Sequence, residues 1–215
     1  MAESDGSLPR LNGKAGSAMK ALIVYGTTEG QTRKIADFVA NRLRKLGDQV
    51  TLVEAAEAPW DLRPNEYEAA ILAASLHAGI YQKPLVGFAR THHLRLCQMP
   101  ALFLSVSLSA ASRDPGDLTS TAACAERFKQ ETGWTSAVVH HVAGAFRFTE
   151  YDFFKRWVMR LIAWEKGVSV GSSQELELTD WNVLAEIADK FHISAATAQK
   201  SLSACDHGTS NAKLD

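Results

Sequence analysis

The sequence predicts an α/β fold of three layers, in which helices cover both faces of a five-stranded parallel sheet. Three observations predict it. Short apolar runs alternate along the chain with segments of helical periodicity. A short polar turn follows the first apolar run directly, and five strands with such a turn after the first fit the strand order 2-1-3-4-5. The 215 residues are 46% hydrophobic, which is enough for one well-filled core.

The first expected strand is Ala21–Tyr25, a continuous apolar run that stops at Gly26. The expected helix Gln31–Leu46 follows, because its apolar residues recur at helical spacing, and Gly47 suits its C-terminal cap. The second strand is expected at Val50–Glu54.

The middle of the chain repeats this pattern. A strand is expected at Ala69–Ala74 and a helix at Pro84–Leu96, where the proline suits the first helical turn. The fourth strand is expected at Ala101–Val106. The segment Leu108–Thr121 then contains proline and glycine, and we interpret it as a long loop that is either a mobile lid or substrate loop or a disordered surface loop.

The last elements are a helix at Thr121–Glu131, which ends before a glycine, and a fifth strand at Ala137–Ala143. The final helix is expected at Thr179–Phe191, with Thr179 or Asp180 as its N-terminal cap. Because buried apolar strands alternate with helices, the sheet should be parallel and covered on both faces.

An insertion of about residues 146–178 separates the fifth strand from the final helix. Its segment Tyr151–Trp164 has helical periodicity, with aromatic and basic side chains interleaved, and fits either a membrane surface or the wall of a pocket. The run Glu175–Leu178 is expected to rejoin the edge of the sheet as a short strand. A helix that simply packs on the domain is the alternative for Tyr151–Trp164.

Composition limits the function classes. Residues 1–18 and 194–215 are small and polar, so we expect disordered tails on either side of one domain at 19–193. The net charge of −1 argues against a nucleic-acid partner. Three widely spaced cysteines suit a reducing compartment and provide neither a metal site nor a disulfide framework. No apolar run is long enough to span a bilayer.

The turn after the first strand predicts a phosphate site. A helix N-terminus there presents unpaired backbone N–H groups and the positive end of the helix dipole, and threonine hydroxyls add donors. The turn has neither the lysine of a Walker loop nor the three glycines of a dinucleotide fingerprint, which favours a terminal monophosphate. The expected phosphate-binding residues are Thr27, Thr28, Glu29, Gly30, Gln31 and Thr32. An ordinary turn capped by Thr28 or Thr32 is the alternative.

Two more loops should lie at the same edge of the sheet, where a flat ring system would be held between them. We expect ring contacts from Ser75, Leu76, His77, Ala78, Gly79 and Tyr81 in the first loop and from Ser105, Val106, Ser107 and Leu108 in the second. The alternatives without a ligand are a surface loop with a packing tyrosine for the first loop and a strand end of small residues for the second.

The pattern T-x-E-G-x-T resembles the phosphate loop of flavodoxins, so the expected fold is flavodoxin-like. More of the chain is similar to the bacterial quinone-dependent protoporphyrinogen IX dehydrogenases, a family of oxygen-independent protoporphyrinogen oxidases. The matching stretches are Gly26–Ala36, Ala74–Tyr81, Met99–Leu108, Ala143–Phe148, Tyr151–Ile162 and Leu178–Ala185.

This resemblance implies FMN as cofactor, a porphyrinogen as electron donor, a membrane quinone as acceptor and a role in haem biosynthesis. Arg113 and Arg147 are then the candidates to bind the substrate carboxylates, and no general base is assigned. The expected location is cytoplasmic, peripheral on the inner face of the cell membrane. Two alternatives keep the flavin: an electron carrier like flavodoxin itself, or an NAD(P)H:quinone reductase.

Overall fold

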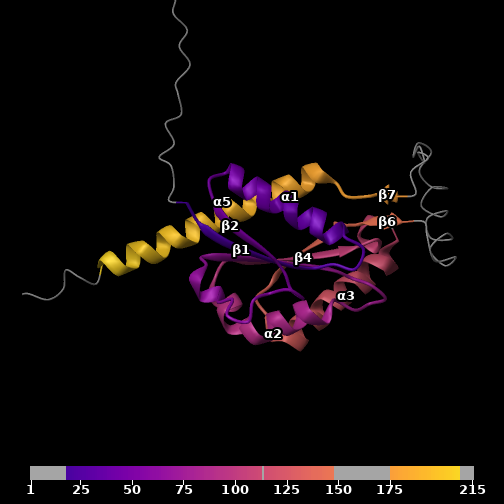
Figure 1. Ribbon diagram of the computed structural model, residues 1–215, viewed down its shortest axis with the longest axis horizontal. Coiled ribbons are helices and arrows are strands. Elements are labelled where there is room, and N and C mark those ends of the chain that lie inside the picture. Colours follow the sequence, from indigo (N-terminus) through magenta and orange to yellow (C-terminus); the bar gives the residue numbers. More distant parts are fainter. Residues whose placement is uncertain (1–17, 113, 148–174, 209–215) are drawn as a thin grey trace, which may run out of the picture.

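The computed structural model describes residues 18–112, 114–147 and 175–208, and Figure 1 shows their arrangement. Five parallel strands form one sheet in the order β2-β1-β3-β4-β5, which confirms the predicted topology. The strands are β1 (Lys20–Gly26), β2 (Gln49–Glu54), β3 (Ala69–Ser75), β4 (Ala101–Ser107) and β5 (Val138–Ala143).

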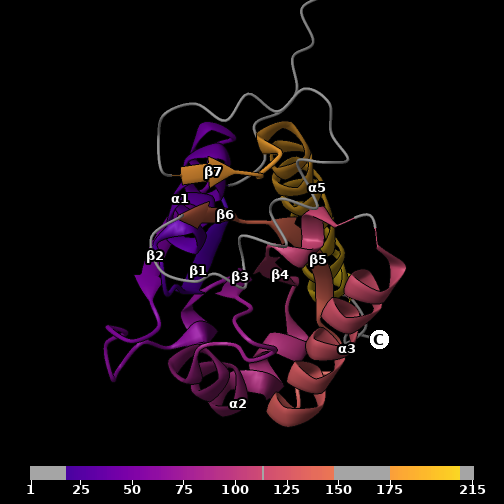
Figure 2. The same ribbon diagram turned by 90° about the vertical axis from the view of Figure 1, so that its right-hand side faces the viewer.

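Helices cover both faces of this sheet, as Figure 2 shows from the end of the strands. On one face lie α1 (Gln31–Lys45) and α5 (Trp181–Gly208), and on the other lie α2 (Lys83–Gln98) and α3 (Pro115–Thr132). Strand β1 explains the two cores, because successive side chains of a strand point to opposite faces. Ala21 and Ile23 pack against α1 and α5, whereas Leu22 and Val24 pack against α2.

The connections that lead from β1, β3 and β4 into the helices lie at the carboxyl edge of the sheet. Of the two short 3-10 turns, η2 (Ser109–Ala111) lies in the last of these connections, whereas η1 (Pro64–Glu66) lies between β2 and β3. The chain leaves β1 and β3 toward helices on opposite faces, so the switch point of the topology lies between these neighbouring strands. This is the edge at which the sequence places the site.

The expected loop Leu108–Thr121 is wrong in its extent. Helix α3 begins at Pro115, because Asp114 caps it by accepting a hydrogen bond from the Gly116 backbone N–H at 2.8 Å. Aspartate at the N-cap followed by proline at the first helical position is a strong start signal. The helix is amphipathic only from Thr121 onward, which is where its apolar periodicity becomes visible in the sequence.

The chain around the insertion also differs from expectation. Strand β7 (Glu175–Glu177) pairs antiparallel with β6 (Ala145–Arg147) in a separate two-stranded sheet, so it does not rejoin the main sheet edge. The predicted helix Tyr151–Trp164 lies outside the described residues, as does most of the expected N-terminal tail 1–18.

Helix α5 continues well beyond its expected end at Phe191, and Figure 1 shows its last turns extending past the sheet. The prediction of a disordered tail from Ser194 is therefore wrong as far as Gly208. Ala195 is fully buried in the core formed with α1, so the helix still packs on the domain beyond Phe191. Small residues give little periodic signal, so the sequence alone did not indicate it.

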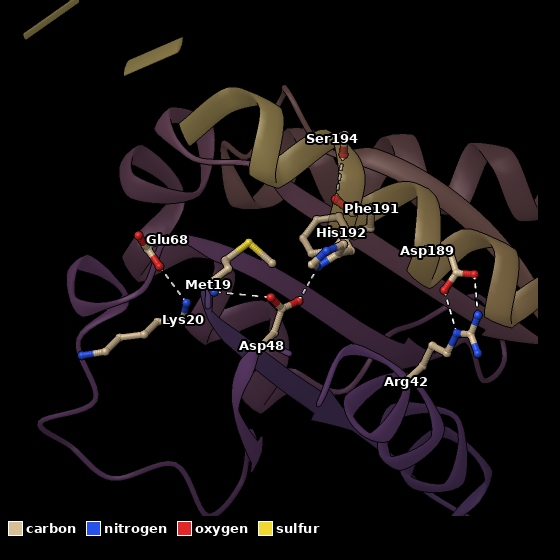
Figure 3. Close-up of polar contacts among 9 residues, drawn as sticks. All are labelled: Met19, Lys20, Arg42, Asp48, Glu68, Asp189, Phe191, His192 and Ser194. Carbon is tan, nitrogen blue, oxygen red and sulfur yellow. Dashed lines mark hydrogen bonds and ion pairs between the residues drawn. The ribbon is translucent and has the colours of Figure 1, made fainter. Parts of the chain in front are cut away.

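A polar cluster ties α5 to the start of the sheet (Figure 3). The Asp48 side chain, only 1% exposed, accepts hydrogen bonds from the Met19 backbone N–H at 3.4 Å and from His192 Nδ1 at 2.7 Å. Nearby, Arg42 of α1 donates from Nε and from one terminal nitrogen to the two Asp189 carboxylate oxygens, each at 2.6 Å. The pKa of the Asp189 carboxyl is lowered, chiefly by these hydrogen bonds from Arg42.

We expect Asp48→Ala to lower the free energy of unfolding by about 2–3 kcal/mol, because it leaves a buried N–H and His192 without their acceptor. The same substitution at the exposed Asp61 is the matched control and should change stability little. Urea unfolding followed by circular dichroism measures both. Equal losses in the two variants would contradict the role assigned to Asp48.

Candidate functional site

The loop between β1 and α1 has the features of an anion site. Gly30 occupies the N-cap position in a left-handed conformation, with φ of 89°, and none of the described side chains caps the helix. Thr32, in the first turn, is 1% exposed, and its Oγ1 has no hydrogen-bond partner. The bland interpretation, a turn capped by Thr28 or Thr32, is therefore wrong. A helix start with uncapped N–H groups and a buried, unpaired hydroxyl suits an anionic ligand.

Two other threonine hydroxyls of this loop each accept a hydrogen bond from within the protein. Thr27 Oγ1 accepts the Gly30 backbone N–H at 2.9 Å, and Thr28 Oγ1 accepts from Gln82 Nε2 at 3.0 Å. A hydroxyl has one hydrogen to donate and can accept at the same time. Both threonines thus keep an O–H available for a ligand oxygen.

The side chain of Gln31 is used elsewhere. It is 7% exposed, and its Nε2 donates to Glu177 Oε1 at 3.0 Å and to Thr179 Oγ1 at 2.9 Å. Thr179 in turn donates to the Ala143 carbonyl at 2.7 Å. These bonds fasten the start of α1 to the segment before α5 and occupy the side-chain donor, so the backbone N–H is the donor that Gln31 can offer an anion. Asp180 caps α5, accepting from two backbone N–H groups at 3.0 and 3.1 Å.

The loop after β3 is a tight hairpin. The backbones of His77 and Ile80 exchange two hydrogen bonds of 3.0 Å, and the residues between them, Ala78 and Gly79, have φ of 48° and 77°. Positive φ at both central positions is the geometry of a type I′ turn, for which glycine is well suited. The turn holds His77, Ala78 and Ile80 exposed at the edge, and Ile80 is 64% exposed.

Tyr81 and Ser105 lie beneath this edge. Tyr81 is 5% exposed, its hydroxyl is 2.8 Å from that of Ser105, and its ring packs edge-on against Phe103 and Phe128. Ser105 is fully buried. Both were expected among ring contacts; the structure turns their side chains into the core, where they anchor the hairpin. Burial raises the pKa of Tyr81 to about 12.

This shift predicts a pH dependence of stability. The folded pKa lies above the unfolded value of 10.0, so the protein should lose stability as the pH rises from 10 toward 12. The slope from this group is at most about 1.4 kcal/mol per pH unit. Tyr81→Phe removes the ionisable group, so its unfolding free energy should fall less steeply over that range, as urea titrations at each pH would reveal. Parallel curves for the two proteins would contradict the assignment.

Strand β4 ends at Ser107, whose Oγ accepts the Ala110 backbone N–H at 3.1 Å and so holds the loop that follows. The loop after β3, residues 75–81, is called the ring loop below. It is joined to the end of β4, because the Leu76 backbone N–H donates to the Val106 carbonyl at 2.7 Å. Leu108 follows, half-buried, at the same edge. Arg113 lies outside the described residues, and for Arg147 only the backbone, in β6, is described.

Gln82 also belongs to this edge of the sheet, although its place there was not predicted from the sequence. This residue stands at the N-cap of α2, yet its side chain does not cap that helix. Its Nε2 donates to Thr28 Oγ1 and to Ser75 Oγ, and a Cβ placed on Gly26 would lie 3.0 Å from the Gln82 Cβ. A side chain at position 26 would force Gln82 to shift by a few tenths of an ångström, so glycine there lets Gln82 pack closely on the end of β1. The only sequence signal was a polar residue next to the Lys83-Pro84 helix start.

Two findings concern metals and membranes. In residues 18–112, 114–147 and 175–208, no three His, Cys, Asp or Glu side chains gather closely enough to hold a metal ion. Among the described helices, none combines the length and apolar character needed to cross a bilayer.

The doubly covered parallel sheet and the uncapped loop after its first strand define a protein of the flavodoxin type. A family model described as a flavodoxin domain matches residues 22–170. Protoporphyrinogen IX dehydrogenase (quinone) of Escherichia coli (strain K12) is 34% identical over 174 residues, which cover 79% of this chain and 93% of that protein. The enzyme of the same name from Leishmania major is 30% identical over 181 residues, covering 82% and 76%.

The chain therefore belongs to the protoporphyrinogen IX dehydrogenase (quinone) family within the flavodoxin domain family. This confirms the resemblance seen in the sequence, and it makes the protein an enzyme, a flavin-dependent oxidoreductase. Among solved structures, a short-chain flavodoxin associated with a bacterial microcompartment aligns with a TM-score of 0.49 at 13% identity, covering 82% of this chain and 99% of that one. A flavodoxin of Streptococcus pneumonia TIGR4 aligns with a TM-score of 0.46 at 16% identity, covering 83% and 99%.

Proposed function

We infer that this protein oxidises protoporphyrinogen IX to protoporphyrin IX with FMN as cofactor and a respiratory quinone as acceptor, a step of haem biosynthesis. The observation that carries the cofactor is the buried, unpaired hydroxyl of Thr32 in an uncapped first helical turn. The substrate and the acceptor rest on the names of the Escherichia coli and Leishmania major relatives.

The phosphate of FMN would be held by the loop after β1. Thr27 and Thr28 each keep a hydroxyl hydrogen, Thr32 has an unpaired hydroxyl, and the first turn of α1 offers backbone N–H groups. Glu29 and Gln31 would contribute only their backbone N–H groups, and Gly30, whose N–H already donates to Thr27 Oγ1, would shape the turn. Neutral donors and the helix dipole are sufficient for a monophosphate, so the absence of a lysine in this loop is consistent with FMN.

The flavin ring would lie between the hairpin after β3 and the loop after β4. Ser75, Leu76, His77, Ala78 and Gly79 would border it on one side, and Val106, Ser107 and Leu108 on the other. When bound, the flavin would supply the redox chemistry, which is the transfer of a pair of hydrogens from the donor to the acceptor. Each pair removed from the porphyrinogen thus reduces one quinone to a quinol. The protein positions the ring and anchors both loops from beneath through Tyr81 and Ser105.

Arg113 and Arg147 remain the proposed partners of the substrate carboxylates. A porphyrinogen of this kind carries two propionates, and a charge-assisted contact to each is worth roughly 1.5–3 kcal/mol. The basic and aromatic segment Tyr151–Trp164 is the proposed contact with the membrane that holds the quinone.

The test is a turnover assay under anaerobic conditions with FMN-loaded protein, protoporphyrinogen IX and a quinone. We expect porphyrin fluorescence to rise only when both the protein and the quinone are present. A rise no faster than with free FMN would refute the proposal. Bleaching of the bound flavin by NAD(P)H alone would instead favour an NAD(P)H:quinone reductase, and no turnover with either donor would favour an electron carrier.

A further inference from the structure

Gln82 lies between the two loops that would hold the opposite ends of the cofactor. Its Nε2 donates to Thr28 Oγ1, in the phosphate loop, at 3.0 Å, and also to Ser75 Oγ, at the start of the ring loop. Both hydrogens of one amide are thus used, each on a different loop. The side chain gives up capping α2 to do so.

The backbone beneath Gln82 leaves it little freedom to move. A Cβ on Gly26 would come within 3.0 Å of the Gln82 Cβ and 3.1 Å of its Oε1, so the glutamine packs directly on the end of β1. Ser75 ends β3, and the next residue, Leu76, is bonded through its backbone to Val106 at the end of β4. One side chain therefore links the phosphate loop to the ring loop, and the ring loop is linked to β4.

We propose that Gln82 is a positioning residue that couples phosphate binding to ring binding, so that occupation of one subsite orders the other. The inference rests on the proposed FMN site and concerns neither the electron donor nor the acceptor. Loops that share a hydrogen-bonding side chain cannot adopt their bound positions independently. A ligand that fixes Thr28 also fixes the amide that holds Ser75, and the coupling must be equal in both directions.

The experiment measures riboflavin binding by quenching of flavin fluorescence, with and without inorganic phosphate, on the full apoprotein. In the wild type, saturating phosphate should tighten riboflavin binding several-fold compared with sodium chloride of equal ionic strength. Gln82→Met keeps the length and the packing on Gly26 but removes the amide. This variant should lose most of the phosphate effect and should bind FMN about tenfold more weakly, as expected when about two hydrogen bonds are lost.

Gln98→Met, at the exposed far end of the same helix, is the matched control and should behave as wild type. If Gln82 had only a structural role, Gln82→Met would weaken riboflavin binding by the same factor with and without phosphate. That result would overturn the proposal. So would a wild type in which phosphate does not change riboflavin affinity, or one that binds neither flavin. Circular dichroism confirms that each variant is folded. Because no porphyrinogen or quinone is used, failure of the proposed reaction leaves this result unaffected.

Discussion

Thr32→Val is expected to weaken FMN binding by about tenfold to a hundredfold while leaving the apoprotein at least as stable as wild type. Valine matches threonine in shape, so only the hydroxyl is lost. In the absence of a ligand that hydroxyl is buried without a partner, a situation that costs about 1–3 kcal/mol. When phosphate is bound, the same group would donate a charge-assisted hydrogen bond of roughly 1.5–3 kcal/mol. The Thr32 hydroxyl therefore destabilises the apoprotein but stabilises the complex with FMN.

Fluorescence titration with FMN and with riboflavin separates the contributions, because riboflavin has no phosphate and its affinity should not change. Urea unfolding of the apoprotein measures the stability. Thr132→Val is the matched control: Thr132 is also buried, but its hydroxyl donates to the Phe128 carbonyl at 2.8 Å, far from the loop. That variant should lose stability and keep FMN affinity. If Thr32→Val bound FMN as tightly as wild type, the phosphate site would have to lie elsewhere.

The sequence predicts the sheet well because its central strands β1, β3 and β4 are buried on both faces. Continuous apolar runs such as Ala69–Ala74 have few alternative structures, and glycines such as Gly47 and Gly133, both with positive φ, mark helix ends. The early uncapped turn also follows from sequence, since the donors it needs are adjacent along the chain. Where small or polar residues decide the structure, as at Asp114 and Ala195, periodicity gives no signal, and both helix bounds there were wrong.

The same distinction separates the site features that can be predicted from the sequence from those that cannot. Backbone features, such as the turn at Gly79, can be anticipated from the residue type, whereas the direction of a side chain depends on distant neighbours. Tyr81 turns inward because Phe103 and Phe128, from other elements, provide an aromatic pocket for it. Gln82 acts through residues at positions 28 and 75, and the sequence gives no reason to connect those positions.

The aromatic pocket under the ring loop carries the largest expected stability effect. Phe103 is fully buried in β4 and stacks on Phe128 with ring centroids 4.3 Å apart. It also packs edge-to-face with Tyr81 and Trp134, at centroid distances of 5.2 and 6.3 Å. Phe103→Ala removes the ring at the centre of this cluster and leaves a cavity, so it should lower the free energy of unfolding by about 3–5 kcal/mol. Urea unfolding of the apoprotein measures the loss.

Phe38→Ala is the control, because Phe38 is only half-buried on the opposite face, against Trp181, and should cost clearly less. Equal losses would contradict the central place of Phe103. The milder Phe103→Leu, expected to cost about 1.5 kcal/mol, keeps the fold available for binding measurements. Tyr81 anchors the ring loop, whereas the phosphate loop leads into a helix on the other face. Phe103→Leu should therefore weaken riboflavin and FMN by the same factor, in contrast to Thr32→Val, which should weaken FMN alone.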